Sequence, residues 1–278
     1  MSRKYAIGVD LGGTKIATGI VDMDAKLLDQ VVMDTAAQEG VEAVLGRMAE
    51  SVRTLMDRQG VKAEDVLGIG VCSPGPLDRE TGIVLAAPNL GWTNVHLGPM
   101  LQELTGITTY VENDANAAAL AEKWMGAGRG AKNMVYITVS TGVGSGIIIN
   151  GSLYAGSHGT AGEVGHIVME DGGPLCGCGQ RGCLEAYASG TAIARMAREA
   201  LESGTQSKIR DLVEDNLEAV SAKVVGEAAA QGDEVANAIL DKAFHYLGLG
   251  MISVINLFDP ELIVIGGGVR QLGGRQAG

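Results

Sequence analysis

Four side chains that can bind a metal ion lie close together between residues 166 and 183. They are His166, Cys176, Cys178 and Cys183, so this stretch holds three of the chain's four cysteines and one of its four histidines. Thiolates and an imidazole are the ligands that tetrahedral Zn²⁺ prefers. Glycines before, between and after the cysteines let the backbone turn tightly enough to bring the ligands round one ion. The spacing predicts a zinc site.

Other states of these cysteines remain open from the sequence. A disulfide within Cys176-Gly-Cys178 would be strained, and metal-free thiols are the remaining alternative. Four protein ligands would complete the coordination sphere, so the zinc would be structural. His166 would then bind zinc through one ring nitrogen and carry a proton on the other, as a fixed hydrogen-bond donor. Cys72 lies alone in an apolar run and is expected in the core.

Two glycine-rich turns between β-branched runs are the second candidate for chemistry. They lie in VDLGGTKIATGIVD (residues 9–22) and VSTGVGSGIIIN (residues 139–150). The chain has no GxxxxGK(S/T) loop, and the first turn leads into a strand pattern rather than the helix of a dinucleotide-binding fold. Two interpretations remain, plain hairpins or hairpins whose backbone N–H groups hold phosphates. On the second, Thr14 offers a hydroxyl and Asp10 lies near a Mg²⁺ ion.

Asp114, in the stretch YVENDANAAAL, is the candidate general base. It lies where a strand pattern ends and an alanine-rich helix begins. A carboxylate beside a transferring phosphoryl group can accept the proton of a hydroxyl. Aspartate is also a frequent helix N-cap, and position alone favours that role.

The patterns around these residues predict an α/β fold. Strands are expected at residues 5–10, 15–22, 27–35, 66–72, 107–113, 133–140, 146–151 and 262–265. Helices are expected at 39–58, at 114–128 and over most of 184–256, whereas the Pro/Gly-rich residues 73–95 are expected to form loops. The strand–turn–strand unit occurs twice, about 130 residues apart. We therefore expect two α/β domains of related build, residues 1–115 and 116–278.

Charge and hydropathy narrow the functional classes. The chain of 278 residues has a formal net charge of −12 and no basic stripe, which disfavours nucleic acid as a partner. No uninterrupted apolar segment reaches the roughly 18 residues of a membrane span, and the apolar run before Asp10 is too short for a signal peptide. We expect a cytoplasmic protein without membrane contact, where a reducing environment disfavours disulfides.

Several motifs resemble a known superfamily. DLGGTK near the N-terminus, the second threonine/glycine turn and the late GGG are similar to the sugar-kinase/actin/Hsp70 superfamily. GEVGH followed by CxCGxxGCxE resembles the ROK family of sugar kinases and regulators, and the resemblance extends over residues 5–269. It implies a two-domain, actin-like (ribonuclease H-like) ATPase fold with a nucleotide cleft between the domains. It also implies an ATP-dependent hexose kinase that uses Mg²⁺, with a small-molecule sugar and ATP as its partners.

The resemblance also implies roles for individual residues. Asp114 would take the proton of the sugar's 6-hydroxyl. The sugar-binding residues would be Gly75, Asn89, Asn113, Asp114, Glu163, His166 and Glu185. The ATP-binding residues would be Asp10, Gly12, Gly13, Thr14, Lys15, Thr141, Gly142, Gly144, Gly266, Gly267 and Gly268. The zinc at His166 and the three cysteines would hold one wall of the sugar pocket.

The substrate and the activity remain open within this family. The LEAYASG continuation is more similar to the family's glucokinases than to its amino-sugar kinases, so glucose is expected. Other hexoses and N-acetylhexosamines remain alternatives. The family also contains sugar-sensing transcriptional regulators, which carry a DNA-binding segment before the kinase-like part. The ten residues up to Asp10 leave no room for one, so a regulator is not expected. The polar end VRQLGGRQAG is shorter than the family's usual C-terminus, which predicts weaker ATP binding or an inactive protein. A homodimer is a further expectation.

Overall fold

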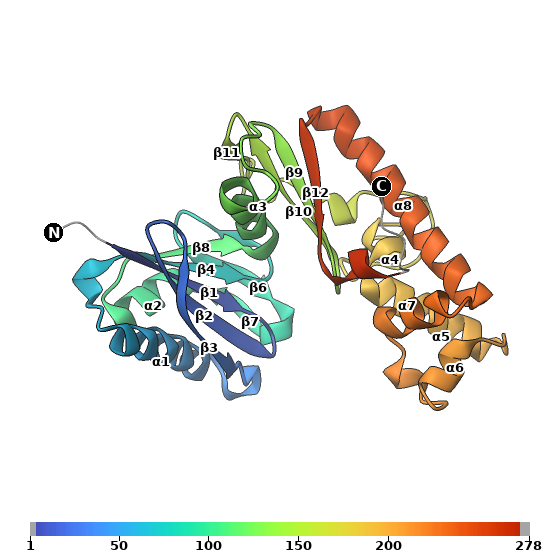
Figure 1. The fold of residues 1–278 in the computed structure, drawn as a ribbon, viewed down its shortest axis with the longest axis horizontal. Helices are drawn as coiled ribbons and strands as arrows, with labels where there is room; N and C mark the ends of the chain where they lie inside the picture. The colour runs from blue at the N-terminus through green and yellow to red at the C-terminus, as the bar shows by residue number, and fades with distance from the viewer. Residues whose placement is uncertain (1–3, 273–278) are drawn as a thin grey trace. The chain divides into compact units, whose positions relative to one another are not determined.

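The computed structural model describes residues 4–272, which form two compact units (Figure 1). The first unit contains residues up to Ala118 together with Ala155–Ala161. The second contains Ala119–Tyr154 and the chain from Gly162 onward. Most of the polar C-terminal end, residues 273–278, lies outside the described residues.

The first unit is built on a five-stranded sheet of order β3-β2-β1-β4-β8. Strands β1, β2 and β3 pair antiparallel, whereas β4 and β8 continue the sheet parallel to β1. The bounds are Tyr5–Leu11 (β1), Lys15–Asp22 (β2), Leu27–Asp34 (β3), Val66–Ser73 (β4) and Thr109–Asn113 (β8). All five strands predicted for this part of the chain are present.

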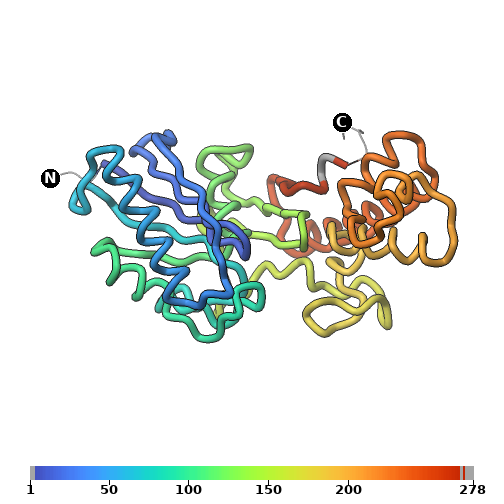
Figure 2. The backbone as a smooth tube through the Cα atoms, turned by 90° about the horizontal axis from the view of Figure 1, so that it is seen from below, coloured from blue at the N-terminus to red at the C-terminus, as the bar shows by residue number. Residues whose placement is uncertain are grey.

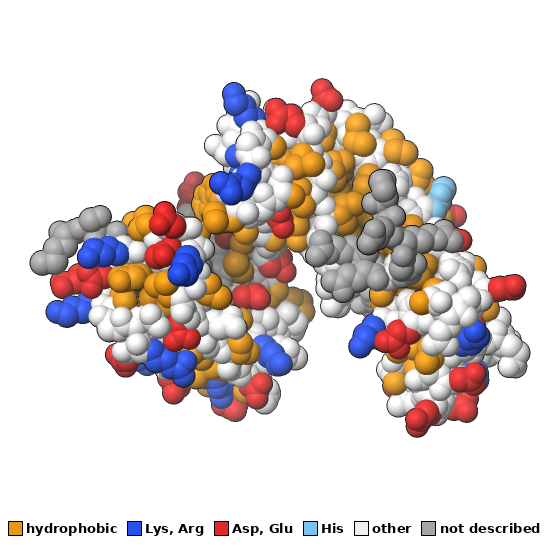
Figure 3. Space-filling view, in the orientation of Figure 1, with side chains coloured by type: hydrophobic (Ala, Val, Ile, Leu, Met, Phe, Trp, Pro, Cys, Tyr) orange, Lys and Arg blue, Asp and Glu red, His pale blue; other side chains and the backbone are white. Residues whose placement is uncertain are grey.

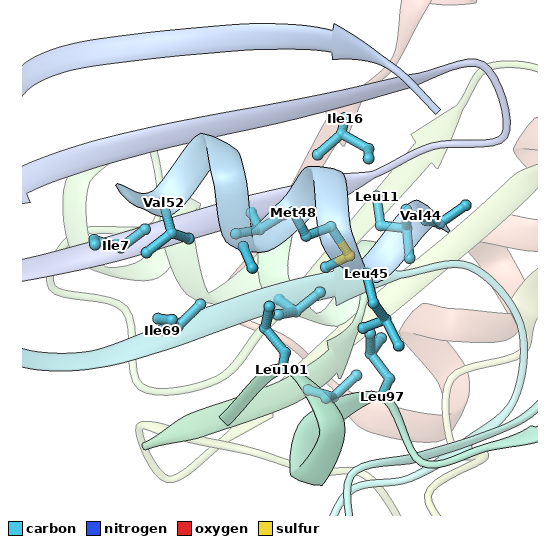
Figure 4. Close-up of a cluster of buried hydrophobic side chains, with 14 of the residues drawn as sticks. Ile7, Leu11, Ile16, Val44, Leu45, Met48, Val52, Ile69, Leu97 and Leu101 are labelled. Atoms are coloured by element: carbon cyan, nitrogen blue, oxygen red, sulfur yellow. The ribbon is translucent and has the colours of Figure 1, made fainter. Parts of the chain in front are cut away.

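Helices α1 (Val41–Gln59) and α2 (Leu97–Thr105) supply the other half of this core. Apolar residues recur on α1 at helical spacing, so one face carries Val44, Leu45, Met48 and Val52. Figure 4 shows these side chains among those of β1, β4 and α2. The polar residues of β1 alternate with its buried ones and therefore point to the opposite face of the sheet.

The expectation of loops at residues 73–95 is wrong. This segment forms a three-stranded antiparallel sheet of order β5-β6-β7, with bounds Leu77–Asp78, Ile83–Ala87 and Trp92–Val95. The strands are short, and the prolines and glycines that suggested loops lie before and between them. Helix α2 was not predicted from the sequence either.

The second unit repeats the strand arrangement of the first. Its sheet has the order β11-β10-β9-β12, with β9 antiparallel to β10 and parallel to β12. The bounds are Met134–Val139 (β9), Val143–Ile149 (β10), Ser152–Leu153 (β11) and Leu262–Gly266 (β12). The first strand of each unit thus pairs antiparallel with the next strand and parallel with a later one.

Helix α3 (Asp114–Met125) joins the end of the first unit to the start of the second. Five further helices belong to the second unit: α4 (Glu185–Ala188), α5 (Gly190–Glu202), α6 (Lys208–Leu212), α7 (Ala222–Ala230) and α8 (Glu234–Phe258). The side chains of Ser189, Ser207, Ser221 and Asp233 cap α5, α6, α7 and α8. Figure 2 traces α5 to α8 as one packed group.

Helix α8 is the one helix within residues 4–272 whose length and composition would allow a membrane span, with a mean hydropathy of 1.3. No such segment was expected from the sequence. The core helix of a soluble protein passes the same test. One face of α8 packs against α4, α5 and α7. Apolar side chains also lie on the surface of this unit, as Figure 3 shows.

Candidate functional site

An acidic cluster lies at the carboxyl ends of the parallel strands in the first unit. Asp10 on β1 is in register with Cys72 on β4, which is in register with Glu112 on β8. Loss of hydration and the charge of Asp114 raise the pKa of Asp10 above its ordinary value. Burial, helped by the charges of Asp10, Asp114 and Glu112, raises the pKa of Cys72 to about 11. These shifts show that Asp10 and Asp114 lie near each other.

Cys72 is half-buried beside these carboxylates rather than in the hydrophobic core. The reason is strand alternation, because its neighbour Val71 fills the core-facing position. The expectation of a core cysteine is therefore wrong.

The polar residues at the start of α3 have different hydrogen-bond and ion-pair partners. The Asn113 side-chain oxygen accepts the N–H groups of Ala115 (2.9 Å) and Asn116 (3.3 Å), so Asn113 caps the helix. Asp114, expected from position alone to be the cap, is the first helical residue. Its side chain is exposed, and one oxygen accepts the N–H of Ala115 at 2.8 Å. Glu112, in contrast, is paired with Arg79 at 2.5 Å. Asp10 and Asp114 are the exposed carboxylates of this cluster, so a ligand can reach both.

The first glycine turn follows β1 directly, two residues beyond Asp10. The Gly12 N–H donates to the Lys15 carbonyl at 2.9 Å, and the Thr35 hydroxyl donates to the Gly12 carbonyl at 2.7 Å. Within residues 4–272 the N–H groups of Gly13 and Thr14 have no protein acceptor. Two backbone donors of the turn are therefore open to an anion.

Asn89 lies beside this turn, since a Cβ added at Gly13 would come within 3.2 Å of its side-chain nitrogen. Gly75 is required by geometry. Its φ is +83°, and an added Cβ would lie 1.9 Å from the Ala86 carbonyl oxygen. The chain at Gly75 therefore lies so close to β6 that a residue with a Cβ would not fit there.

The metal-ligand cluster of the second unit has the geometry of a tetrahedral site. Ligand atoms of His166, Cys176, Cys178 and Cys183 all lie within 4.8 Å of one another. The His166 Nδ1 to Cys176 Sγ distance is 3.6 Å, and the Cys178 Sγ to Cys183 Sγ distance is 3.8 Å. A tetrahedral zinc with its usual bond lengths requires about 3.6 Å for such an N–S pair and about 3.8 Å for such an S–S pair. The four residues fit Zn²⁺, and all four cysteines of the chain are free of disulfides.

The cluster is reinforced by the loop that carries it. The Cys176 N–H donates to the Gln180 carbonyl at 2.8 Å. Isolated antiparallel β-bridges pair Val168 with Cys183 and Leu175 with Arg181. Burial raises the pKa of Cys176 to about 12, while the Gln180 backbone N–H lowers that of Cys178. A metal must therefore displace a firmly held proton from Cys176.

A pair of tyrosines ties this loop to the helices behind it. The hydroxyl groups of Tyr187 on α4 and Tyr246 on α8 both donate to Glu170, at 2.6 and 2.8 Å. Their rings stack with centroids 3.8 Å apart. Gly182 has a φ of +78°, and an added Cβ would lie 1.7 Å from the Glu170 carbonyl oxygen. The loop is therefore fixed on its helix side by contacts that need no metal.

The second glycine turn joins β9 to β10 and contacts this loop. One Glu185 oxygen accepts the Val143 N–H at 2.9 Å. The N–H groups of Thr141 and Gly142 have no acceptor within the described chain. Glu163 is exposed just before the short helix η4 (Val164–His166). Glu163, His166 and Glu185, predicted to bind sugar, thus lie around one strand end.

A cavity of about 910 Å³ opens next to the second turn. It is lined by the turn, the starts of α5 and α7 and the chain after β12, including Ser140, Thr141, Gly190, Thr191, Lys223 and Gly268. Cβ atoms added at Gly266 and Gly267 would lie 2.1 Å from the Tyr136 hydroxyl and 2.2 Å from the Val139 carbonyl oxygen. The glycines therefore let the chain lie close against β9.

Sequence reasoning missed the α5 and α7 walls of this cavity. Gly190, Thr191, Lys223 and Glu227 line it and were not among the predicted residues. The serine–glycine–threonine start of α5 is a sequence signal that could have indicated them, because such helix starts bind anions.

The predicted residues divide between the two units. Asp10, Gly12 to Lys15, Gly75, Asn89, Asn113 and Asp114 lie in the first. Glu163, His166, Glu185, the three cysteines, the Thr141–Gly144 turn and Gly266 to Gly268 lie in the second.

Comparison with known proteins identifies the family. The ROK family model matches residues 6–275. The chain belongs to the ROK family. It is 42% identical to a glucokinase of Thermotoga maritima, over 98% of this chain and 84% of that protein. A xylose repressor of Caldicellulosiruptor bescii is 31% identical, over 94% of this chain and 65% of the repressor.

The fold is that of ROK sugar kinases. A ROK family glucokinase from Streptomyces griseus, solved in complex with glucose and AMPPNP, superimposes with a TM-score of 0.81. The two chains are 36% identical, and the match covers 95% of this chain and 83% of that one. The two-domain actin-like ATPase fold implied by the sequence motifs is therefore confirmed.

Proposed function

We propose that this ROK protein is an ATP-dependent kinase that phosphorylates the 6-hydroxyl of glucose. The observation that carries the proposal is Asp114, an exposed carboxylate at the sheet edge near a glycine turn with open backbone donors. Phosphoryl transfer needs little more from a protein than positioned phosphates, charge neutralisation and a base for the attacking hydroxyl. The glucokinase relative and the ligands in the S. griseus structure support glucose and ATP.

In this proposal the glycine turns hold the phosphates. The N–H groups of Gly13 and Thr14, and those of Thr141 and Gly142, have no protein acceptor in the described chain and would bind phosphate oxygens. Asp10 would hold Mg²⁺, which neutralises phosphate charge. The raised pKa of Asp10 supports this role, since a cation would stabilise the carboxylate that its surroundings destabilise. The cavity beside the second turn would take the adenosine half.

The sugar would be bound by polar groups that the fold leaves available. The Asn113 oxygen is used in capping α3, which leaves its NH₂ group for a sugar hydroxyl. His166 directs Nδ1 toward the cysteines, so with a metal bound at Nδ1 its Nε2 would carry the proton and donate to the sugar. Gly75, Asn89, Glu163 and Glu185 complete the proposed set. Zinc, held by His166 and the three cysteines, would be structural and would fix the orientation of this histidine.

Asp114 would accept the proton of the 6-hydroxyl as the hydroxyl attacks the terminal phosphate. One of its oxygens already accepts the Ala115 N–H, which fixes the carboxylate and directs the other oxygen to the substrate.

The test is ATP consumption against a panel of hexoses and N-acetylhexosamines, with Asp114→Asn beside the wild type. We expect turnover on glucose, lowered in Asp114→Asn by about 10²- to 10⁴-fold with ATP affinity retained. Asp22→Asn is the matched control, because Asp22 accepts backbone N–H groups at the end of β2. No turnover by folded, zinc-loaded protein would overturn the kinase proposal.

The same panel separates the alternatives. Turnover on an N-acetylhexosamine instead of glucose would retain the mechanism and change the substrate. Saturable sugar binding without ATP consumption would support a sugar-binding role, which the similarity to a xylose repressor makes the second candidate. We also propose a cytosolic location, since zinc-binding thiols in an enzyme are typical of a reducing compartment.

A further inference from the structure

Glu185 makes a contact that a sugar-binding role does not require. Its Oε2 accepts the backbone N–H of Val143, in the second glycine turn, at 2.9 Å. Its Oε1 lies 3.6 Å from the Cys176 Sγ. The side chain is half-buried at the start of α4 and so has few alternative positions. The Glu185 carboxylate therefore connects the metal-ligand loop (residues 166–183) to the second glycine turn.

The backbone around this contact is shaped to admit the carboxylate. A Cβ added at Gly142 would lie 2.4 Å from the Glu185 Oε2, so a larger residue there would displace the carboxylate. A Cβ added at Gly165 would lie 2.1 Å from the Val143 carbonyl oxygen. Val143 is thus confined at its N–H by Glu185 and at its carbonyl by the η4 backbone.

The other side of the turn is held by the start of α5. The Gly190 N–H donates to the Ser140 carbonyl at 2.7 Å, and the Thr191 hydroxyl donates to the Thr141 carbonyl at 2.8 Å. These bonds fix carbonyl groups, whereas Glu185 fixes an N–H. The N–H groups of Thr141 and Gly142 have no acceptor among residues 4–272. The turn is therefore supported from both sides with two donors left open.

We propose that Glu185 is a positioning residue for the nucleotide. By holding Val143, its carboxylate fixes the turn in the conformation that presents the Thr141 and Gly142 N–H groups to phosphate. A negative charge near phosphate would by itself oppose binding, so the effect comes from the hydrogen bond. The inference rests on the proposed function, in which this turn binds ATP phosphates, and it adds that a residue assigned to the sugar also determines nucleotide affinity.

The experiment measures Mg²⁺–ADP affinity by calorimetry in the absence of sugar, for the wild type and three variants. Glu185→Gln keeps an oxygen that can accept the Val143 N–H, whereas Glu185→Asp is one methylene too short and Glu185→Ala has no acceptor. We expect Glu185→Asp and Glu185→Ala to weaken ADP binding about ten- to a hundredfold. Glu185→Gln should bind ADP within about threefold of the wild type while its KM for glucose rises.

The control is Glu170→Gln, which alters a carboxylate of the same loop that bonds to Tyr187 and Tyr246 instead of the turn. It should leave ADP affinity unchanged. Zinc content and melting temperature are measured for every variant. If Glu185→Ala does not fold, the comparison of Glu185→Gln with Glu185→Asp decides the question.

The experiment distinguishes failure of this inference from failure of the proposed function. If the wild type binds ADP and Glu185→Asp and Glu185→Ala bind it equally well, the inference is wrong and Glu185 serves the sugar alone. If Glu185→Gln weakens ADP binding as much as Glu185→Ala, an acceptor for the Val143 N–H does not preserve the affinity, and the inference is also wrong. If the folded wild type does not bind ADP at all, the proposed function fails.

Discussion

The two glycine turns occupy equivalent places in the two units but are supported differently. Each follows the first strand of its unit, and each joins an antiparallel pair, β1 with β2 and β9 with β10. In each sheet the first strand also pairs in parallel with a later strand, β4 or β12. The repeated strand–turn–strand pattern in the sequence therefore corresponds to a repeated sheet topology.

The supports differ in where they come from. Thr35, the residue after β3, holds the first turn through its hydroxyl and its backbone N–H, which donates to the Thr14 carbonyl at 2.8 Å. The second turn is held by Glu185, which lies two residues after Cys183 of the metal-ligand cluster. The first turn thus depends on its own sheet, whereas the second depends on Glu185 and on the start of α5. Equivalent topology does not give the two turns equivalent supports.

Removing the metal should have the largest effect and should act on the second turn alone. A ligand at about 1,000 times its Kd stabilises the folded state by about 4 kcal/mol, and zinc removal would take that contribution from the second unit. We expect hydrogen exchange at the Val143 amide to accelerate strongly after chelation. Exchange at the Gly12 amide, which donates to Lys15 in the first turn, should not change.

The matched variants for this prediction are Cys176→Ser and Cys72→Ser. Cys176 is in the metal-ligand cluster, whereas Cys72 lies beside the acidic cluster of the first unit. Cys176→Ser should lose zinc and reproduce the effect of chelation, whereas Cys72→Ser should retain zinc. Equal acceleration of exchange in both turns would show that the two supports are not independent.

Alanine substitutions in the two turns give the next largest effect. At Gly142 the new Cβ would lie 2.4 Å from the Glu185 Oε2, in a half-buried contact. At Gly13 it would lie 3.2 Å from the Asn89 side-chain nitrogen, and Asn89 is exposed. We expect Gly142→Ala to weaken ADP binding by about tenfold or more, and Gly13→Ala by less than about threefold.

Calorimetry on both variants, with melting temperatures recorded, checks this prediction. If Gly13→Ala lost more ADP affinity than Gly142→Ala, the first turn would contribute more to phosphate binding than the second, and the prediction would be wrong. Similar losses in both would remove the distinction between the turns.

Local patterns were sufficient to predict the elements that place the first turn. Strand alternation in residues 5–22 and the glycines between the two runs determine the β1–β2 hairpin without help from distant residues. The cysteine spacing likewise predicted a cluster whose ligand atoms do lie within 4.8 Å. In both cases the interacting residues are close in sequence, so residue type and spacing carry most of the information.

Features that depend on distant residues were not predicted. The contact of Glu185 with Val143 spans 42 positions in the chain, and no local pattern indicates it. The strands β5, β6 and β7 are short, and the turn residues between them dominate the local composition. The cavity walls from α5 and α7 depend on how helices pack. These features arise from tertiary contacts, which propensity and periodicity do not encode.

The smallest expected effect on stability concerns the acidic cluster beside the first turn. Because loss of hydration and the charge of Asp114 raise the pKa of folded Asp10, ionised Asp10 destabilises the fold at neutral pH. Asp10→Asn should therefore raise the melting temperature at pH 7 by on the order of 2 °C, while abolishing turnover. The gain should disappear below about pH 4, where Asp10 is neutral in both folded and unfolded states.

Asp78 provides a control of opposite sign in the same unit. Hydrogen bonds from Thr81, with a further one from Glu80, hold the pKa of Asp78 below its ordinary value, so its ionised form stabilises the fold at neutral pH. Asp78→Asn should lower the melting temperature at pH 7, and that loss should also vanish as the pH falls through the folded pKa of Asp78. Melting temperatures of both variants from pH 3 to pH 8 test the pair. If Asp10→Asn destabilises the protein at pH 7, Asp10 is ionised in the folded state at a net gain. The acidic cluster would then be a structural feature of the sheet edge rather than a site whose stability is sacrificed for binding Mg²⁺ and phosphate.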